Sequence, residues 1–350
     1  MPSVLKISSP DELIAFVPHA LGFTPQGMVC LPLGGGPTAR LDIPRSPNEM
    51  DRFLRSLSDV YLRQHHPRQV ALLAYGQDGR SCEHALAALG EALAGSEGPG
   101  PNVGPMLWVN GDQWMDVLTG EHGIVHPSAH ARMAAEFALL GRAMPVARRG
   151  DLAAALQGDA TEVARLMPAA EARLSAMDLA GSQEEATWVG ARIDQFGRDR
   201  LYLSDDDAAR LLTAIRDGAA RDAAENRMSR HHAPVQVEFW HDLVRRAPAE
   251  VRDTPAAMLA LSCYLYGQGA QAWVAIDQVA TSHPLAELVK MALERAIHPR
   301  DLEQALRADA PGALMQQNAL RRDGLMHRRA QDPPAGPSTN ARPASPDPGR

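Results

Sequence analysis

Apolar and polar residues follow two different spacings along the chain. Residues 28–33 and 38–43 have the short apolar pattern of strands, and residues 69–75 form a near-continuous apolar run typical of a strand covered on both faces. Apolar residues at helical spacing separate these runs. Strands that alternate with helices predict a mixed, partly parallel sheet. We therefore expect an α/β domain at residues 1–127.

Two Ser-Pro-x-Glu sequences predict the starts of helices in this domain. In residues 9–12 and 46–49, the serine hydroxyl can accept a hydrogen bond from the backbone N–H of the glutamate, and proline suits the first helical position. We expect Pro18 to end the first of these helices and Gly22 to provide a left-handed exit. A further strand is expected at residues 4–7.

Helical spacing continues after the strand patterns stop. In residues 128–308, amphipathic helices joined by short loops predict an all-α region of stacked helical hairpins. One of them, near residues 255–282, has the spacing of a tetratricopeptide-like hairpin, but no second copy follows at a fixed period. The chain is thus expected to be helix-rich α+β overall. Residues 309–350 are rich in Pro, Gly, Ser, Asp and Arg, a composition that predicts a disordered tail.

Composition and charge indicate where in the cell the protein is located and which classes of partner it does not bind. The net charge of −7 argues against nucleic-acid binding, which depends on excess positive charge. No run of about 18 apolar residues is present, so no membrane span is predicted. Asp11 and Glu12 stand where a signal peptide would be apolar. The three cysteines form no CxxC pair and suit buried thiols in a reducing compartment. We expect a cytoplasmic protein.

Three histidines, His122, His126 and His130, are the candidate metal ligands. Three imidazoles can complete a zinc shell. However, Gly123 and Pro127 argue against one continuous helix, so the four-residue spacing does not ensure that the rings converge. The alternative is that these histidines are polar surface residues. The sequence does not identify a cofactor.

Candidate ligand-binding residues are His19, Arg40, Asp42, Trp114 and Arg148. His19 is a polar residue in an apolar corner, where its ring can either handle a ligand or proton, or satisfy a backbone carbonyl at the helix end. Arg40 and Asp42 share one face of a strand and either point into a cleft or belong to the charged surface. Trp114 lies in a Gly-Asp-Gln-Trp sequence, and Arg148 in an Arg-Arg-Gly-Asp sequence.

Two further motifs have simpler structural explanations. The triple glycine at residues 34–36 leads into a strand, whereas phosphate-binding loops lead into a helix, so a hairpin turn is expected. The three aspartates at residues 205–207 stand in the first turn of a helix, where they offset the helix dipole, although they could also bind a divalent ion. No GxSxG, Walker, GxGxxG or HExxH motif is present. The sequence therefore names no reaction.

Several sequence blocks occur in an order that resembles a known family. They are LIAFVPHALGF at residues 13–23, TARLDIP at 38–44, VNGDQWMDV at 109–117, GRAMPVARRGDLAAAL at 141–156 and FWHDLVRRAP at 239–248. Together they resemble the actinobacterial domain of unknown function 4192 over most of residues 1–306. The resemblance implies an intracellular protein with no established activity. Relatives often carry cysteines after the tryptophan block, where this chain has Thr-Gly-Glu-His-Gly, so no thiol-dependent role is implied.

Two hypotheses of function follow. The first is a non-catalytic protein-interaction or regulatory module whose helical half binds another protein, supported by the helical hairpins and the missing catalytic motifs. The alternative is an enzyme or small-ligand binder that uses a cleft of the α/β domain near His19 and residues 109–130. Open α/β sheets bind ligands at the carboxyl ends of their strands, which favours a site of this second kind.

Overall fold

The computed structural model describes residues 6–34, 38–55, 57, 61–62, 67–94, 101–140, 144–216 and 218–308. Met1–Glu303 form one compact unit, and Gln304–Arg350 form a second unit, of which only the end of a helix is described. The tail predicted at residues 309–350 lies outside the described residues, as does the first half of the strand predicted at residues 4–7. Lys6 and Ile7 are described and belong to no strand.

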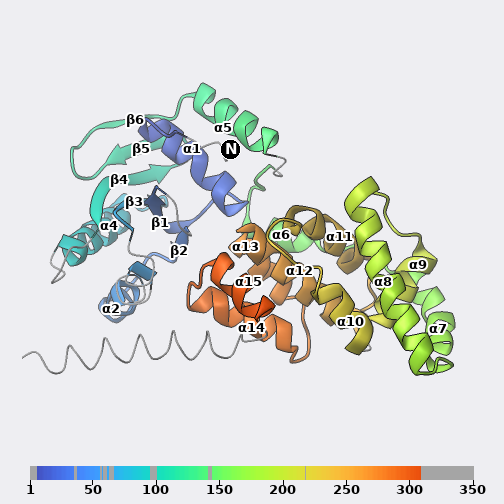
Figure 1. Cartoon of the computed structure of the whole chain (residues 1–350). Helices are drawn as coiled ribbons and strands as arrows, with labels where there is room; N and C mark the ends of the chain where they lie inside the picture. Colours follow the sequence, from blue (N-terminus) through green and yellow to red (C-terminus); the bar gives the residue numbers. More distant parts are fainter. Residues whose placement is uncertain are drawn as a thin grey trace, which may run out of the picture. The chain divides into compact units, whose positions relative to one another are not determined.

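One six-stranded mixed sheet organises the N-terminal part of the chain (Figure 1). Its strands are β1 (Gly27–Leu33), β2 (Ala39–Leu41), β3 (Gln69–Tyr75), β4 (Asn102–Asn110), β5 (Gln113–Asp116) and β6 (His122–Ile124). Their order across the sheet is β2-β1-β3-β4-β5-β6; β3 and β4 are parallel, and the other neighbours are antiparallel. The predicted mixed, partly parallel sheet is confirmed.

Two tight turns of this sheet use glycines with left-handed backbone conformations. Gly34 follows β1 with φ +101°, and β1 pairs with β2 in the antiparallel register Met28 to Leu41. The predicted hairpin is therefore present, although the other two glycines of the triple lie outside the described residues. Gly111, between β4 and β5, has φ +60° and completes the Asn-Gly turn.

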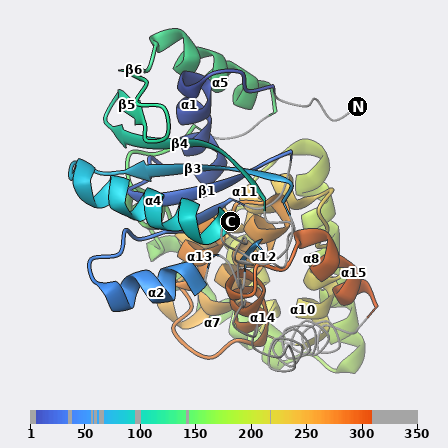
Figure 2. The same cartoon turned by 90° about the vertical axis from the view of Figure 1, so that its left-hand side faces the viewer.

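Helices cover both faces of the sheet (Figure 2). They are α1 (Pro10–Leu21), α2 (Pro47–Arg55), α4 (Gly79–Ala94) and α5 (Pro127–Leu139). On one face, Val70, Leu72 and Ala74 belong to the core that α2 and α4 enclose. The intervening Ala71 and Leu73 are also fully buried and face the other side, where α1 contacts β4 and α5 packs on α1. After Gln69, β3 is apolar from Val70 to Tyr75 because both of its faces are covered there.

The first helix starts as predicted but does not end as predicted. The Ser9 hydroxyl accepts a hydrogen bond from the Glu12 N–H at 3.2 Å, and the Glu12 carboxylate accepts one from the Ser8 N–H at 2.8 Å. The prediction that Pro18 ends this helix is wrong, because α1 continues through Pro18 to Leu21. The missing proline N–H costs one hydrogen bond, and burial of the following turn offsets it. The left-handed exit at Gly22 is confirmed by its φ of +82°.

The rest of the described chain is helical, which confirms a helix-rich second half. Its helices are α6 (Arg149–Ala155), α7 (Thr161–Ser175), α8 (Leu179–Asp199), α9 (Asp205–Ala214), α10 (Gly218–Glu225), α11 (Ala233–Arg246), η2 (Ala249–Val251), α12 (Asp253–Tyr266), α13 (Gly269–Ile276), α14 (Pro284–Glu294) and α15 (Pro299–Arg307). The aspartates that begin α9 follow Ser204, whose hydroxyl accepts from the Asp207 N–H at 3.1 Å. No helix in the described ranges is both long and apolar enough to cross a bilayer.

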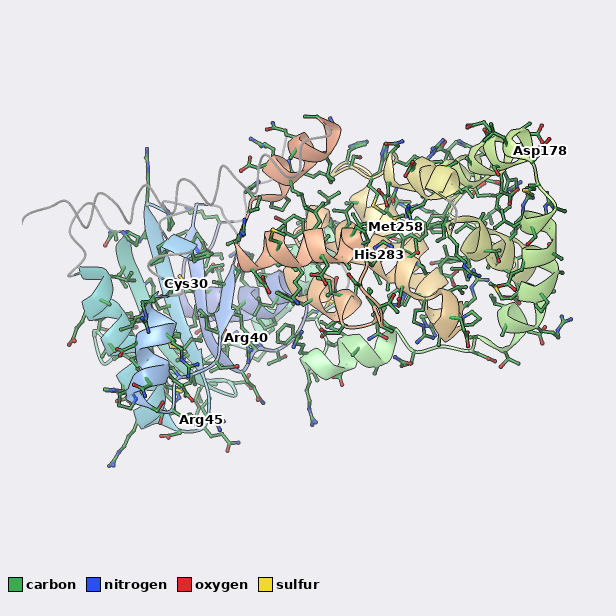
Figure 3. The ribbon with its side chains drawn as sticks, turned by 90° about the horizontal axis from the view of Figure 1, so that it is seen from below. Cys30, Arg40, Arg45, Asp178, Met258 and His283 are labelled. Carbon is green, nitrogen blue, oxygen red and sulfur yellow. The ribbon has the colours of Figure 1, made fainter. Side chains whose placement is uncertain are left out.

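Helix α12 is the centre of this helical part. It contacts α11, α13 and α14 on different sides, and Met258 at its middle has no exposed surface (Figure 3). A helix that is apolar on every side must be surrounded by other elements. Gly267, with φ +85°, ends α12 and lets the chain turn into α13. The two helices follow one another and pack together. A tetratricopeptide-like hairpin near residues 255–282 stays a prediction, as does a domain boundary at residue 127.

The turn after α1, residues 22–24, is hydrogen-bonded to Val146, which lies in the segment that leads into the helical part. We call this turn the corner. Phe23 forms a parallel bridge with Val146, whose N–H donates to the Gly22 carbonyl at 3.0 Å and whose carbonyl accepts from the Thr24 N–H at 3.0 Å. The Gln271 side chain of α13 lies against Gly22, 3.2 Å from the position that a Cβ would take there. The corner therefore joins both parts of the compact unit.

This geometry predicts that Gly22→Ala lowers the free energy of unfolding by about 1–2 kcal/mol or more, since alanine is strained at positive φ and its methyl group meets Gln271. Gly111→Ala is the matched control, because Gly111 also has positive φ but nothing lies within 4 Å of the position that its Cβ would take. Urea unfolding of both variants should give the larger loss for Gly22→Ala. Equal losses would mean that the contact with Gln271 contributes nothing.

Candidate functional site

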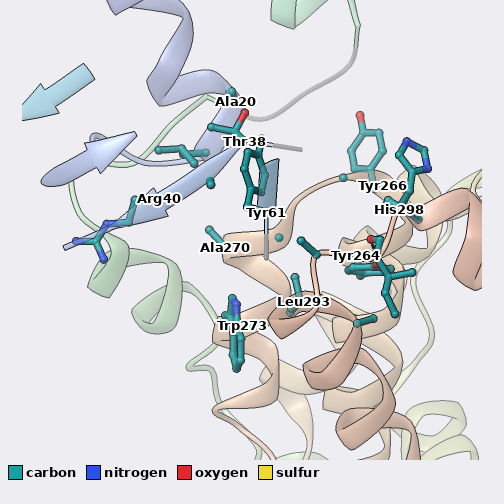
Figure 4. Close-up of a pocket in the computed structure, with 18 of the residues that line it drawn as sticks. Ala20, Thr38, Arg40, Tyr61, Tyr264, Tyr266, Ala270, Trp273, Leu293 and His298 are labelled. Atoms are coloured by element: carbon teal, nitrogen blue, oxygen red, sulfur yellow. Dashed lines mark hydrogen bonds between the residues drawn. The ribbon is translucent and has the colours of Figure 1, made fainter. Parts of the chain in front are cut away.

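A cavity of about 1000 Å³ lies between the sheet side of the compact unit and helices α12 to α14 (Figure 4). Its aromatic lining comes from both sides and comprises Phe16, Phe23, Tyr61, Phe137, Tyr264, Tyr266 and Trp273. Figure 4 shows Tyr61 extending toward the helical side, between Thr38 and Ala270. Aromatic residues make up only 5% of the chain, so seven of them around one cavity are a marked concentration.

The inner part of the cavity is apolar and uncharged. Leu57, Tyr61 and Ile297 are buried there, and the buried Tyr264 hydroxyl donates a hydrogen bond to the Ile297 carbonyl. Burial raises the pKa of Tyr264 far above its usual range, and burial together with the Cys30 thiol does the same for Tyr61. Both phenols therefore stay neutral at any physiological pH.

Two of the arginines that line the cavity are held by neighbouring groups. The Arg40 guanidinium donates to the Gln26 carbonyl through Nε at 2.9 Å and through Nη2 at 2.7 Å, and Nη2 lies 2.7 Å from the Asp42 carboxylate. Arg149 lies 3.4 Å from Asp277, and both side chains are largely exposed. Arg40 and Asp42 thus form a pair with each other, and Arg40 contributes to the cavity wall.

Arg230 and His298 line another part of the cavity. The His298 Nδ1 accepts a hydrogen bond from the Arg300 N–H at 3.1 Å, so the neutral ring carries its proton on Nε2. Burial lowers the pKa of His298; Asp301 opposes this shift, and the positive charges of Arg230 and Arg300 add to it. His298 is therefore a neutral hydrogen-bond donor at neutral pH, close to the exposed Arg230 cation.

Comparison with known families identifies the chain. The sequence model of one family, described as "Domain of unknown function (DUF4192)", matches residues 10–300. The chain belongs to the DUF4192 family. The matched range contains the whole sheet and every described residue that lines the cavity. The search of curated proteins and the search of solved structures found no match.

His19 of this DUF4192 protein does not line the cavity itself but packs against a residue that does. Its buried ring stacks on Phe137, with centroids 4.7 Å apart and planes at 27°, and Phe137 lines the cavity. Within the described structure, its buried Nδ1 has no hydrogen-bond partner, so the expected bond to a backbone carbonyl is not seen on that nitrogen. Burial lowers the pKa of His19, and His130 adds to the shift. A direct role of His19 in ligand binding stays a prediction.

The lowered pKa predicts how His19 affects stability. An unfolded histidine titrates near pH 6.5, so below that pH the unfolded chain binds a proton that buried His19 resists. The contribution of His19 to stability is then constant above about pH 6.5 and falls as the pH decreases through this value. His19→Phe keeps the stacking on Phe137 and removes the titration. Urea unfolding at pH 7.5 and pH 5.5 should show a smaller loss for His19→Phe than for wild type; the exposed His84→Phe is the control. Equal losses contradict the account.

Trp114 and Arg148 have local roles in the DUF4192 fold and are not among the described residues that line the cavity. The Trp114 indole N–H donates to one Asp11 oxygen at 2.9 Å, and the other oxygen accepts from the His126 N–H at 2.9 Å. Asp11 thus ties the start of α1 to β5 and α5. Arg148 precedes α6, where its N–H donates to the Asp151 carboxylate at 2.9 Å. Ligand binding by Asp42, Trp114 or Arg148 stays a prediction.

The three candidate metal ligands are held apart by different partners. The His122 ring lies near a backbone carbonyl, the His126 ring pairs with Ser128 at 2.7 Å, and the His130 ring lies 3.8 Å from Asp112. Among the residues that the structure describes, no group of three or more His, Cys, Asp or Glu side chains is placed to hold a metal ion. Pro127 starts α5 and leaves His122 on the preceding strand, so the three histidines do not share one helix. Metal binding by His122, His126 and His130 stays a prediction.

The cysteines are inert in this DUF4192 structure. Cys30, Cys82 and Cys263 are free and buried, as expected from their spacing. Burial raises the pKa of Cys30 to about 12 and that of Cys263 to about 12, and it also raises the pKa of Cys82. Because the thiolate is the reactive form, none of the three is activated as a nucleophile.

The sequence did not point to the cavity. Tyr61, Tyr264 and Trp273 fit ordinary apolar helix faces, and Arg230 and His298 stand in unrelated segments. One signal in the sequence is compositional: in a chain with few aromatic residues, Tyr264 and Tyr266 both lie within the three residues before the helix-breaking Gly267. That pattern places two aromatic rings at the end of a helix, but it does not show what faces them.

Proposed function

We propose that this protein is a binding protein that takes a small organic ligand into the cavity between the sheet side and α12 to α14. The observation that carries the proposal is the aromatic lining contributed by both sides of a space of about 1000 Å³. Cavities for small organic ligands are mostly apolar, have volumes of roughly 300–1,000 Å³ and contain a few polar groups that orient the ligand.

The chemistry of the lining supports binding rather than reaction. The inner phenols are neutral, and the described cysteines are protonated, buried thiols outside the lining. The Tyr264 hydroxyl donates to the Ile297 carbonyl, and the His298 Nδ1 accepts from the Arg300 N–H, so these two lining groups are not paired as nucleophile and base. Aromatic faces and aliphatic walls recognise a ligand by shape and by removal of apolar surface from water.

This proposal keeps the small-ligand hypothesis drawn from the sequence but moves the site. The ligand contacts Phe137 and Arg40 on the sheet side and Trp273 on the helical side, while His19 acts through its stacking on Phe137. Three expectations from the sequence remain proposals beside it: a protein partner for the helical half, a regulatory role and a cytoplasmic location. No contact in the described residues indicates which protein such a partner would be.

The proposal is tested with N-phenyl-1-naphthylamine, an uncharged aromatic dye that fluoresces when it leaves water. We expect one dye molecule to bind per native chain. Ala270→Phe, which places a ring inside the cavity, should weaken binding at least tenfold, with the near-ultraviolet circular dichroism spectrum unchanged. Ala219→Phe is the matched control, because Ala219 is exposed on α10 and away from the lining. No binding by the wild-type protein, or equal binding by both variants, contradicts the proposal.

A further inference from the structure

The polarity of the cavity lining changes from apolar inside to charged at the exposed edge, and this change indicates which kind of ligand fits. Its inner wall holds buried groups such as Leu57 and Tyr264, whereas Arg230 and Glu294 are exposed and mark the opening to solvent. A ligand that fits both regions has an apolar body directed inward and a polar group directed outward. The sign of the charge at the opening then decides which polar group is favoured.

Positive charge predominates in the lining. The described lining contains Arg40, Arg149 and Arg230 but, of the carboxylates, only Glu294. Arg40 is committed to Gln26 and Asp42, and Arg149 faces Asp277. The Arg230 backbone is fixed by the bond from its N–H to the Glu303 carboxylate at 3.1 Å, whereas its guanidinium takes part in no hydrogen bond or ion pair within the described part of the chain.

His298 lines the same cavity as Arg230, and burial and the positive charge of Arg230 both lower the pKa of its ring. The His298 Nδ1 is occupied by the Arg300 N–H, which leaves the Nε2–H of the neutral ring as a donor. A guanidinium and an imidazole N–H offer donors only, so they match a group whose oxygens accept hydrogen bonds. A carboxylate, sulfonate or phosphate provides such oxygens and compensates the Arg230 charge.

We infer that the ligand is an organic anion with a flat apolar body, held with its rings among Tyr61, Tyr264 and Trp273 and its acidic group at Arg230 and His298. This inference rests on the proposed function, because it assigns a ligand class to the same cavity. It makes Arg230 the residue that selects charge, while the aromatic residues supply affinity for any flat apolar molecule.

The test compares two dyes that share a ring system: 8-anilinonaphthalene-1-sulfonate, which is anionic, and N-phenyl-1-naphthylamine, which is neutral. Arg230→Gln should weaken binding of the sulfonate about fivefold, as expected for one partly exposed ion pair, and should change binding of the neutral dye less than about twofold. Arg198→Gln, an exposed arginine of α8 outside the lining, is the matched control and should change neither.

The outcomes separate the ligand class from the proposed function. If Arg230→Gln affects both dyes equally, or neither, the inference of an anionic ligand is overturned while the binding function stands. If neither dye binds the native protein at one per chain, the proposed function itself is overturned. Near-ultraviolet circular dichroism spectra recorded with each titration ensure that the signal comes from native protein, since the sulfonate dye also binds loosely packed states.

Discussion

Replacing Glu185 by glutamine is expected to lower the free energy of unfolding by about 3 kcal/mol. The Glu185 side chain, only 5% exposed, joins α8 to α9 through two hydrogen bonds from Arg210, each 2.7 Å long. The Arg210 guanidinium also lies 3.7 Å from the centre of the Trp188 ring. Loss of the carboxylate charge leaves this largely buried cation without its partner. An unpaired buried charge destabilises the fold more than removal of both charges does.

Two further variants isolate the cause of that loss. Glu184→Gln removes the neighbouring exposed carboxylate of the same helix and should change stability by less than about 0.5 kcal/mol. The double variant Glu185→Leu with Arg210→Met removes both charges and should recover much of the loss, because a buried pair contributes little beyond the penalty for breaking it. Urea unfolding measures all three. A loss below about 1 kcal/mol for Glu185→Gln would show that the pair does not hold α8 to α9.

Trp240→Ala is expected to cost about 3–5 kcal/mol, the range for removal of a large aromatic side chain from a core. Trp240 has no exposed surface and packs edge-on against Phe239. Its indole N–H donates to Gln236 at 3.1 Å, and the Gln236 amide donates to the Arg227 carbonyl at 3.1 Å. The truncation therefore leaves a void between α11 and its neighbours, and the Gln236 amide oxygen loses its donor.

Conservative and exposed replacements make this prediction specific. Trp240→Phe keeps most of the packing but loses the bond to Gln236, so its loss should be smaller, about 1–3 kcal/mol. Tyr202→Ala removes an aromatic ring that is 58% exposed and should cost less than about 1 kcal/mol. Equal losses for Trp240→Ala and Trp240→Phe would mean that the hydrogen bond, and not the packing, dominates at this position.

The elements that the sequence predicted well are those whose environment is local. Residues 69–75 are apolar at nearly every position because both faces of β3 are covered, and Ser9 and Ser204 are capping serines whose bonds lie within one turn. The predicted end of α1 is wrong because it depends on tertiary packing and not on the local sequence. Pro18 is a strong local signal, but tertiary burial of Val17, His19 and Leu21 decides that the helix continues.

The candidate site depends on contacts that span the whole chain, which explains why little of it was predicted. Arg40 was singled out and does line the cavity, yet its charge is used to hold Gln26 and Asp42. Tyr61 and Trp273 look like core residues in the sequence because packed and cavity-lining aromatic residues have the same spacing. Only the arrangement of α1, the β1–β2 hairpin and α12 to α14 shows that a space remains between them.

The position of the bound ligand tests the central claim most directly. The chain has five tryptophans, all within the described residues, whose indole N–H groups can be followed by ¹⁵N NMR, and of these Trp273 lines the cavity. Trp273→Phe assigns its resonance. On titration with N-phenyl-1-naphthylamine, we predict that the Trp273 resonance shifts with one-to-one saturation while those of Trp188 and Trp240 stay in place. A dye that binds without moving the Trp273 resonance would contradict the account.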